Sequence, residues 1–284
     1  MGSSGQLGID LLKTLNKIGS VTSLNKSNGD LLKLDELFKT FENIKPNVIV
    51  NAAAYTLVDK AEEENDLALK INYESIKEIS TYCYKNNITL VHFSTDYVFD
   101  GKSEKPIKES HPTNPINFYG YTKELADNAI VNSRCNHFIF RISWVYSKHG
   151  KNFPNTIIEL CSTKKIVSIV DDQFGSPTST DFIAKVVADC LYKKIKNNIG
   201  SYGIYNLTTN GIVSWYEFAT TIIEHAEKKG KRFLCPAKKL QPIKSSQFPT
   251  AAKRPIYSKL CNKKIINVFS VDINSWFSYY EKVF

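Results

Sequence analysis

The sequence predicts an α/β fold in which a doubly wound parallel sheet forms the larger part and a C-terminal cap the smaller part. Two observations carry this prediction: β-branched runs alternate with amphipathic segments, and a glycine-rich turn opens the chain. The runs are typical of buried parallel strands and fall at residues 47–51, 88–94, 138–143 and 166–170. Segments 61–86 and 117–133 carry apolar residues every three or four positions, as helices do. Repeated strand–helix–strand units imply a parallel sheet with helices on both faces.

The opening turn has the glycine spacing of a dinucleotide-binding loop. It comprises Gly2, Gly5, Gln6, Leu7 and Gly8, and residues 9–15 continue as a helix. Glycines let the backbone approach a pyrophosphate closely, and the N-terminus of the following helix offers free N–H groups and a positive dipole potential. The turn therefore indicates a Rossmann-type domain.

Only Met1 precedes this turn, whereas a doubly wound sheet has a central strand at that place. Without such a strand the neighbouring strand would leave backbone groups unpaired, at about 1–3 kcal/mol for each buried group. We therefore expect the first strand to be missing from the sheet. Two explanations stay open: residues are missing upstream of Met1, or the chain is a truncated, inactive homologue of an enzyme.

The second half of the chain has a different pattern. After about residue 145 the alternation loosens, and glycine, proline and aromatic residues punctuate shorter elements. We expect residues 1–145 to form the dinucleotide-binding domain. Residues 146–284 are expected to form mainly a substrate-binding cap, with some segments that return to the first domain.

Composition narrows the possible partners and the compartment. The formal net charge is +9, but the lysines are scattered, which favours a solvated surface over a nucleic-acid interface. The six cysteines form no CxxC pair, which indicates reduced thiols and neither a disulfide scaffold nor a zinc site. No apolar run approaches the roughly 20 residues of a membrane helix. We expect a cytoplasmic protein without a membrane, nucleic-acid or metal partner, and leave a homodimer open.

The strongest chemical signal is a tyrosine–lysine pair, Tyr119 and Lys123, at the start of a predicted helix. Residues four apart lie on one helix face, with β-carbons about 5–6 Å apart. Lowering a tyrosine pKa from about 10 to about 7 needs roughly 4 kcal/mol. One cation at about 4 Å and an effective dielectric of about 20 supplies an interaction of that size. Lys123 can thus make Tyr119 a general acid at neutral pH, whereas Tyr121 has no such partner.

Two strand ends add to this signal. Thr95 follows the apolar run 88–94, and a hydroxyl at the carboxyl end of a parallel strand points into the crevice where α/β sheets bind ligands. Thr95 there can hydrogen-bond a carbonyl that is being reduced. The strand at 47–51 runs into Ala52 and Ala53, whose small side chains let a ribose or nicotinamide lie against the backbone, although core packing also selects such residues.

Seven stretches together resemble the dTDP-4-dehydrorhamnose reductase family of extended short-chain dehydrogenases. They are GSSGQLG, PNVIVNAAAYTLVDKAE, STDYVFDG, NFYGYTKELAD, FRISWVY, DDQFGSPT and PTAAKRPIYSKL, and their order and spacing fit the family over nearly the whole chain. The resemblance implies a Rossmann domain with a substrate-binding cap and NADPH or NADH as hydride donor. It also implies reduction of the C4 ketone of dTDP-4-dehydro-6-deoxy-L-mannose, a nucleotide-sugar, to dTDP-L-rhamnose.

Residue by residue, the resemblance assigns the catalytic roles to Thr95, Tyr119 and Lys123. Thr95 would hold the C4 oxygen, Tyr119 would protonate it, and Lys123 would bind the nicotinamide ribose while lowering the tyrosine pKa. The remaining implied positions are Gly2, Gly5 and Gly8 at the pyrophosphate, Asp30 and Leu31 at the adenine, Ala52, Ala53 and Thr56 at the ribose and nicotinamide, Asp96, Tyr97 and Trp144 at the sugar, and Arg254 near the nucleotide of the substrate.

Alternatives stay open for the identity of the cofactor and for the class of function. Residues 23–27 follow the glycine turn at the distance where an acid usually binds the 2′-hydroxyl of NAD, and they contain none, which mildly favours NADPH. A different nucleotide-sugar is the first rival interpretation. A non-catalytic, dinucleotide-binding regulatory protein of the same fold is the second, although a pure binder has no need of the acid Tyr119.

Overall fold

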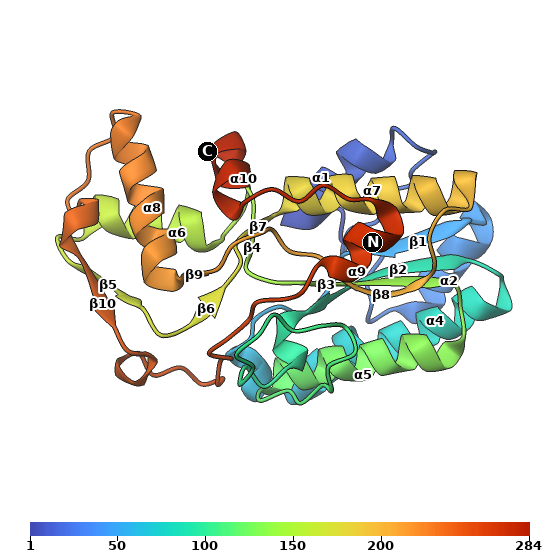
Figure 1. The fold of residues 1–284 in the computed structure, drawn as a ribbon. Helices are drawn as coiled ribbons and strands as arrows, with labels where there is room; N and C mark the ends of the chain where they lie inside the picture. The colour runs from blue at the N-terminus through green and yellow to red at the C-terminus, as the bar shows by residue number, and fades with distance from the viewer.

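The computed structural model describes residues 1–284 and contains a central sheet of four parallel strands. The strands are β1 (Val48–Asn51), β2 (Thr89–Thr95), β3 (His137–Ile142) and β8 (Gly203–Asn206), in the spatial order β1-β2-β3-β8 (Figure 1). Every pair is parallel, so the carboxyl ends of all four strands meet at one edge of the sheet. This confirms the predicted α/β fold class.

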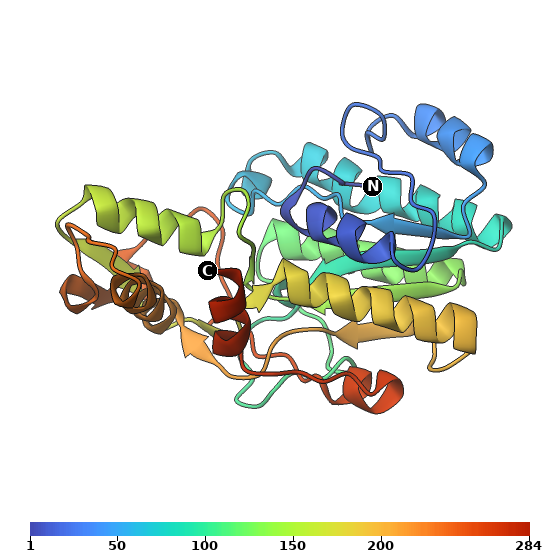
Figure 2. The same ribbon diagram turned by 90° about the horizontal axis from the view of Figure 1, so that it is seen from above.

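Helices cover both faces of this sheet because its strands alternate apolar side chains between the faces. Val91 and Phe138 pack with the helices α1 (Gln6–Leu15) and α7 (Thr180–Asn197). Leu90 and Ile139 point the other way and pack with α2 (Leu34–Ile44), α4 (Ser75–Lys85) and α5 (Phe118–Ser133). Figure 2 shows α1 and α7 side by side across the sheet, in agreement with their extensive mutual contact.

A second group of elements packs around its own core at the other end of the molecule (Figure 1). Its helices are α6 (Phe153–Thr163), α8 (Trp215–Lys228) and α10 (Trp276–Val283). Its strand pairs are β4 (Val145–Tyr146) with β7 (Thr178–Ser179), β5 (Val167–Val170) with β10 (Leu240–Ile243), and β6 (Phe174–Gly175) with β9 (Val213–Ser214). Between these elements the chain returns to the sheet through α7, β8 and α9 (Lys263–Phe269).

The parallel strand expected at 166–170 is present, and the continuous helix expected at 61–86 is not. The run at 166–170 does form a strand, β5, but it pairs with β10 and lies outside the central sheet. The helical segment expected at 61–86 is divided into four pieces: the 3₁₀ turn η1 (Lys60–Glu62), α3 (Asn65–Leu69), the π-helical turn η2 (Lys70–Glu74) and α4. Asn72 lies within the π turn, and its buried side chain bonds backbone groups of Tyr55 and so ties the helix to the loop after β1.

The sheet edge along β1 carries one paired residue and no further strand. The Met1 ammonium donates to the Val50 carbonyl at 2.7 Å, and the Ala52 N–H donates to the Met1 carbonyl at 3.1 Å, which is a parallel ladder one residue long. Burial lowers the pKa of this ammonium to about 6. Beside β1 lies a cavity of about 650 Å³, lined largely by apolar side chains of α1, α7 and the strand. The place of the expected first strand is therefore held by Met1 alone.

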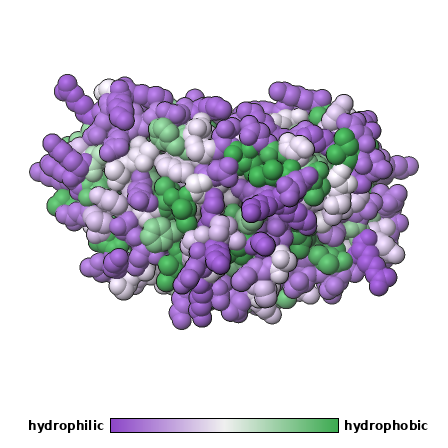
Figure 3. Space-filling view, viewed as in Figure 1, coloured by the Kyte–Doolittle hydropathy of each residue, from purple (hydrophilic) through white to green (hydrophobic).

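No helix combines the length and the apolar character that a membrane crossing requires. The face of the molecule in Figure 3 is mostly hydrophilic, with hydrophobic side chains in small, separated areas. That distribution agrees with the scattered lysines of the sequence.

Candidate active site

The glycine turn is built by contacts that exclude side chains. Gly2 has a φ of +77°, and a Cβ there would lie 2.6 Å from the backbone nitrogen of Ala53. A Cβ on Gly8 would lie 2.0 Å from the carbonyl oxygen of Gly2. Only glycine fits at either place, because both clashes are with backbone atoms. The turn is thereby held against the loop that follows β1.

Helix α1 begins directly at this turn with its N-terminal N–H groups free. Its N-cap residue, Gly5, has no side chain to bond them, and its first turn has no acidic residue. The positive end of the helix dipole and these N–H groups suit an anion. The turn thus fits the pyrophosphate of a dinucleotide in both shape and charge.

Gln6 joins this turn to the second half of the chain. Its side-chain oxygen accepts hydrogen bonds from Ser147 at 3.0 Å and from Asn152 at 2.9 Å, and its side-chain nitrogen donates to the Lys151 carbonyl at 3.1 Å. Leu7, the next residue, is buried in the core under α1. The predicted cofactor turn therefore also fixes the loop that leads into α6.

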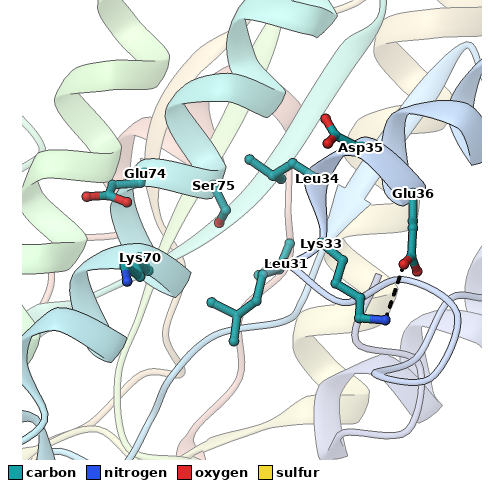
Figure 4. A pocket seen from close by; sticks show the side chains of 9 residues that line it. Leu31, Lys33, Leu34, Asp35, Glu36, Lys70, Glu74 and Ser75 are labelled. Atoms are coloured by element: carbon teal, nitrogen blue, oxygen red, sulfur yellow. Dashed lines mark hydrogen bonds and ion pairs between the residues drawn. The ribbon is translucent and has the colours of Figure 1, made fainter.

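The positions predicted to face the adenine lie in the loop before α2. Asp30 accepts a hydrogen bond from the Leu32 N–H at 3.0 Å, and Leu31 is buried. Leu31 lines a cavity of about 450 Å³ whose rim carries charged side chains, including Lys33, which bonds Glu36 at 3.2 Å (Figure 4). None of the three predicted catalytic residues lines this cavity.

Thr95 and Tyr119 meet at the carboxyl end of β2. Thr95 ends the strand and caps the 3₁₀ turn η3 (Asp96–Val98) by accepting a hydrogen bond from the Tyr97 N–H at 3.2 Å. Helix α5 approaches this turn so closely that a Cβ on Gly120 would lie 2.1 Å from the Tyr97 carbonyl oxygen. The Tyr119 ring packs edge-on against that of Tyr97, with centroids 6.0 Å apart. The absence of a side chain at Gly120 therefore allows the phenol of Tyr119 to lie beside Thr95.

The charge around Tyr119 differs from the prediction. Burial and, next, the Asp96 carboxylate raise the pKa of the Tyr119 phenol, and hydrogen bonding by Thr95 opposes that rise only in part. Lys123 does not contact the phenol: its Nζ lies 2.9 Å from Nε2 of His92. The expectation that Lys123 lowers the tyrosine pKa is thus wrong, because a buried histidine takes up the lysine nitrogen while burial and Asp96 raise that pKa.

Asp96 and Tyr97, predicted at the sugar, lie in η3 beside Thr95. Burial raises the pKa of the Asp96 carboxyl to about 6, although neighbouring hydroxyls, including that of Thr95, oppose the rise. The Thr95 hydroxyl donates to Asp96 Oδ1 at 3.2 Å. Burial also raises the pKa of the Tyr97 phenol. A carboxyl group that titrates near neutrality therefore sits next to the predicted catalytic hydroxyl.

Arg254 reaches this edge of the sheet from the C-terminal loop. Its guanidinium donates two hydrogen bonds to Asp59, at 2.6 and 3.1 Å, and Asp59 also accepts from the Ala252 N–H at 3.1 Å. Burial lowers the pKa of Arg254, but the hydrogen bonds and charge interactions with Asp59 and Tyr97 together outweigh it, so the pKa is raised. Arg254 is therefore a fixed group beside Tyr97, and not a free cation on an exposed loop.

Trp144 lies where the chain leaves β3 for the second group of elements. It has a φ of +48°, in the left-handed region, which is strained for a bulky residue. Its ring stacks on Trp215 with centroids 3.4 Å apart, and a Cβ on Gly175 would lie 2.4 Å from it. The ring of Trp144 is thus held flat within the second group of elements, between Trp215 and Gly175.

Thr56, predicted at the ribose and nicotinamide, is exposed in the loop after β1.

Several residues of this site escaped the sequence reasoning. Asp127 and Arg141 form a buried ion pair at 3.1 Å, and Ser94 donates to the same carboxylate oxygen at 3.0 Å. His92 lies between the apolar residues Val91 and Phe93 in a strand that is buried throughout, and its signal was this ionisable side chain among buried neighbours. Asp59 lies in the stretch VDKAE, which contributed to the family resemblance but received no role.

Comparisons with known proteins agree with this geometry. The family model described as "RmlD substrate binding domain" matches residues 1–284. The chain is 34% identical over 282 residues to dTDP-4-dehydrorhamnose reductase of Escherichia coli strain K12, an alignment that covers 97% of this chain and 92% of that protein.

Solved structures give the same result. The structure of dTDP-4-dehydrorhamnose reductase from Bacillus anthracis in complex with NADP has a TM-score of 0.90 and 32% identity, covering 99% of this chain and 96% of that chain. The ortholog from Clostridium acetobutylicum has a TM-score of 0.89 and 35% identity with the same coverage. The family match spans the whole sequence, so this chain belongs to the dTDP-4-dehydrorhamnose reductase family.

Proposed function

We propose that this chain is an oxidoreductase that uses NADPH to reduce the C4 ketone of dTDP-4-dehydro-6-deoxy-L-mannose to dTDP-L-rhamnose. The observation that carries the proposal is the meeting of Thr95 and Tyr119 at the carboxyl end of β2. The adjacent strand, β1, ends at the residues against which the glycine turn packs. Membership in the family, with a relative solved in complex with NADP, supports both the reaction and the cofactor.

In this proposal the cofactor is held by the glycine turn and by the loop after β1. Gly2, Gly5 and Gly8 would leave room for the pyrophosphate, and the free N–H groups of α1 would face it. Ala52 and Ala53 would present small side chains to the ribose and nicotinamide. Bound NADPH supplies the hydride, and the protein supplies the proton and the geometry.

The residues at the end of β2 perform the proton transfer. The substrate C4 oxygen accepts hydrogen bonds from Thr95 and Tyr119, which polarise the carbonyl. As C4 gains the hydride, its oxygen takes the phenolic proton of Tyr119, so that the ketone becomes a secondary alcohol. Solvent then returns a proton to the tyrosinate. General acid assistance of this kind contributes about 10²–10⁴ in rate.

The protonated phenol that burial favours is the form that a general acid requires. A high pKa keeps the proton on Tyr119 before the reaction but makes its transfer less favourable. An ammonium on Lys123 that faced the nicotinamide ribose and the phenol would make this proton transfer more favourable, because a cation stabilises the tyrosinate that forms. The role of Lys123 therefore depends on its release from His92.

Arg254 is proposed to bind the diphosphate of the nucleotide-sugar. Its guanidinium is already held in place by two hydrogen bonds to Asp59, and a planar fork of this kind suits phosphate oxygens. Asp96, Tyr97 and Trp144 would surround the sugar. The substrate would thereby lie between η3 and the C-terminal loop.

We also propose a division into a dinucleotide-binding domain, residues 1–145, and a substrate-binding cap, mainly residues 146–284. The separate core around α6, α8 and α10, which takes all its buried members from Tyr146 onward, supports the division. The packing of α7, β8 and α9 onto the sheet supports the return of some segments to the first domain. All six cysteines are free, and burial raises the pKa of the Cys83, Cys161 and Cys190 thiols, which suits a reducing compartment such as the cytoplasm.

The test is NADPH oxidation, followed by absorbance, with dTDP-4-dehydro-6-deoxy-L-mannose as substrate. Tyr119→Phe is expected to retain NADPH binding, measured by cofactor fluorescence, and to lose about 10²-fold or more of kcat. Tyr121→Phe is the matched control, since Tyr121 is 44% exposed on the same helix, and it should keep full activity. Equal kcat values in the two variants would show that Tyr119 is not the acid. NADPH binding without turnover would favour the regulatory alternative.

A further inference from the structure

The inference concerns a buried chain of three polar side chains below the proposed site. Asn51 ends β1, His92 lies in β2, and Lys123 lies in the second turn of α5; each is only 1% exposed. Asn51 Nδ2 lies 3.3 Å from His92 Nδ1, and Lys123 Nζ lies 2.9 Å from His92 Nε2. The parallel register of β1 and β2 places Asn51 directly beside His92.

The hydrogen bonds of Asn51 determine where its amide nitrogen points. The Ala53 N–H donates to Asn51 Oδ1 at 3.1 Å, so this oxygen must face the backbone and Nδ2 must face the histidine. An amide nitrogen only donates, and therefore His92 Nδ1 must accept.

A neutral imidazole carries a single proton, and with Nδ1 as acceptor that proton is on Nε2. Nε2 then donates to Lys123 Nζ, which must offer a lone pair. An ammonium has no lone pair, so the lysine in this arrangement is a neutral amine. The other tautomer would place the Nδ1–H of His92 against an N–H of Asn51, with both groups buried.

The charges around these groups agree with that assignment. Burial lowers the pKa of Lys123 to about 8 and, together with Lys123, lowers the pKa of His92 well below its usual value. Asp127 on α5 is the carboxylate that opposes the shift of Lys123; its Oδ2 is paired with Arg141 on β3, whereas its Oδ1 has no hydrogen-bond partner. Tyr119, one turn earlier on α5, is protonated. Asp127 is therefore the anion that favours an ammonium at Lys123, and burial outweighs it.

We propose that His92 is a positioning residue: in alkaline solution, where Lys123 is a neutral amine, His92 holds it until the cofactor binds, when Lys123 takes up one proton and turns toward the ribose as an ammonium. The proton comes from solvent, and His92 keeps its own proton on Nε2. An ammonium and the Nε2–H of His92 repel each other, so protonation itself releases the lysine. This proposal rests on the proposed cofactor site but does not require turnover.

Calorimetric titration of the unsubstituted chain with NADPH, in buffers of different ionisation enthalpy at about pH 9, measures the proton uptake. The expected value is close to one proton per chain, and it should decline toward zero at about pH 7, where the amine is already protonated. The 2′-phosphate of NADPH is fully ionised at the higher pH and does not contribute. No uptake at the higher pH would overturn the proposal.

His92→Gln separates the positioning role from a merely structural one. A glutamine can turn its carbonyl oxygen toward Lys123 and accept from an ammonium, so the variant should bind NADPH with proton uptake near zero. His111→Gln, at an exposed histidine, is the control and should keep the uptake of the unsubstituted chain. Equal uptake in all three proteins would show that His92 does not set the charge of Lys123.

A second measurement needs no variant and stays valid if His92→Gln fails to fold. The Kd of the unsubstituted chain for NADPH should rise above pH 8, toward about tenfold per pH unit, because one proton must be taken up for each cofactor bound. A Kd that is constant from pH 7 to 9 would contradict the proposal. Failure to reduce the sugar nucleotide would refute the proposed function and leave both binding results unaffected.

Discussion

Gly8→Ala tests the cofactor site through its tightest backbone contact. The added methyl group would lie 2.0 Å from the carbonyl oxygen of Gly2 and 2.8 Å from its carbonyl carbon. Both atoms belong to the turn, so no flexible side chain can move aside. Overpacking of this kind costs about 1–3 kcal/mol.

The cost should appear in cofactor affinity. The free chain can relieve the clash by opening the turn, whereas the bound cofactor needs the turn closed, so the penalty falls mainly on the complex. At about 1.4 kcal/mol per tenfold change, the Kd for NADPH should rise roughly 5- to 150-fold. The assay is fluorescence titration with NADPH, accompanied by urea unfolding to show that the variant remains folded.

Gly19→Ala provides the matched control, because a methyl group there meets no atom within 4 Å and the residue does not have a positive φ. It should leave the Kd unchanged. Gly5→Ala, whose methyl group would lie 3.3 Å from the Gly2 carbonyl oxygen, should fall between the two. The reasoning is refuted if Gly8→Ala and Gly19→Ala bind NADPH with the same affinity.

Substitutions of Asp127, Arg254 and Asp96 test the other charged groups of the site. Asp127→Asn leaves Arg141 without its buried partner and should lower the free energy of unfolding by about 3–5 kcal/mol in urea titrations; an unchanged midpoint would contradict this. Arg254→Lys loses the planar fork and should raise the KM for the nucleotide-sugar about tenfold with little change in kcat, whereas the exposed Arg232→Lys should change neither. The pKa of Asp96 is raised to about 6 in the folded chain, so its stabilising contribution is complete below its ordinary pKa of 3.8 and is lost as the pH rises through 6. Relative to the unsubstituted chain, Asp96→Asn should therefore gain about 3 kcal/mol of stability between pH 4 and 7, and a constant difference would show that Asp96 titrates normally.

Much of the fold follows from local patterns. The strands β1, β2 and β3 and the helix α5 lie within one residue of the predicted segments, because each is a continuous pattern bounded by polar or turn residues. Strand β8 (GIYN) is short and begins with a glycine, so its own sequence carries little strand signal. Strand β5 has the signal, but periodicity does not identify the partner of a strand. The partner depends on where the rest of the chain leads it.

For the residues of the site, too, local patterns reveal some features and not others. The spacing of Tyr119 and Lys123 places both on one helix face, yet the direction of the lysine side chain depends on a histidine in another element. The pairing of Arg254 with Asp59 joins residues 195 positions apart, which no local pattern reveals. Side chains whose position follows from helix periodicity or from the end of a strand could therefore be predicted from the sequence. The charge state of those side chains could not, because it depends on tertiary neighbours.

The most direct test of the whole account is a single incubation of the unsubstituted chain with NADPH and dTDP-4-dehydro-6-deoxy-L-mannose. Absorbance records the cofactor consumed, and mass spectrometry records the sugar nucleotide. We predict one NADPH oxidised for each sugar nucleotide that gains two hydrogen atoms. A chain that binds NADPH but leaves both compounds unchanged would contradict the account.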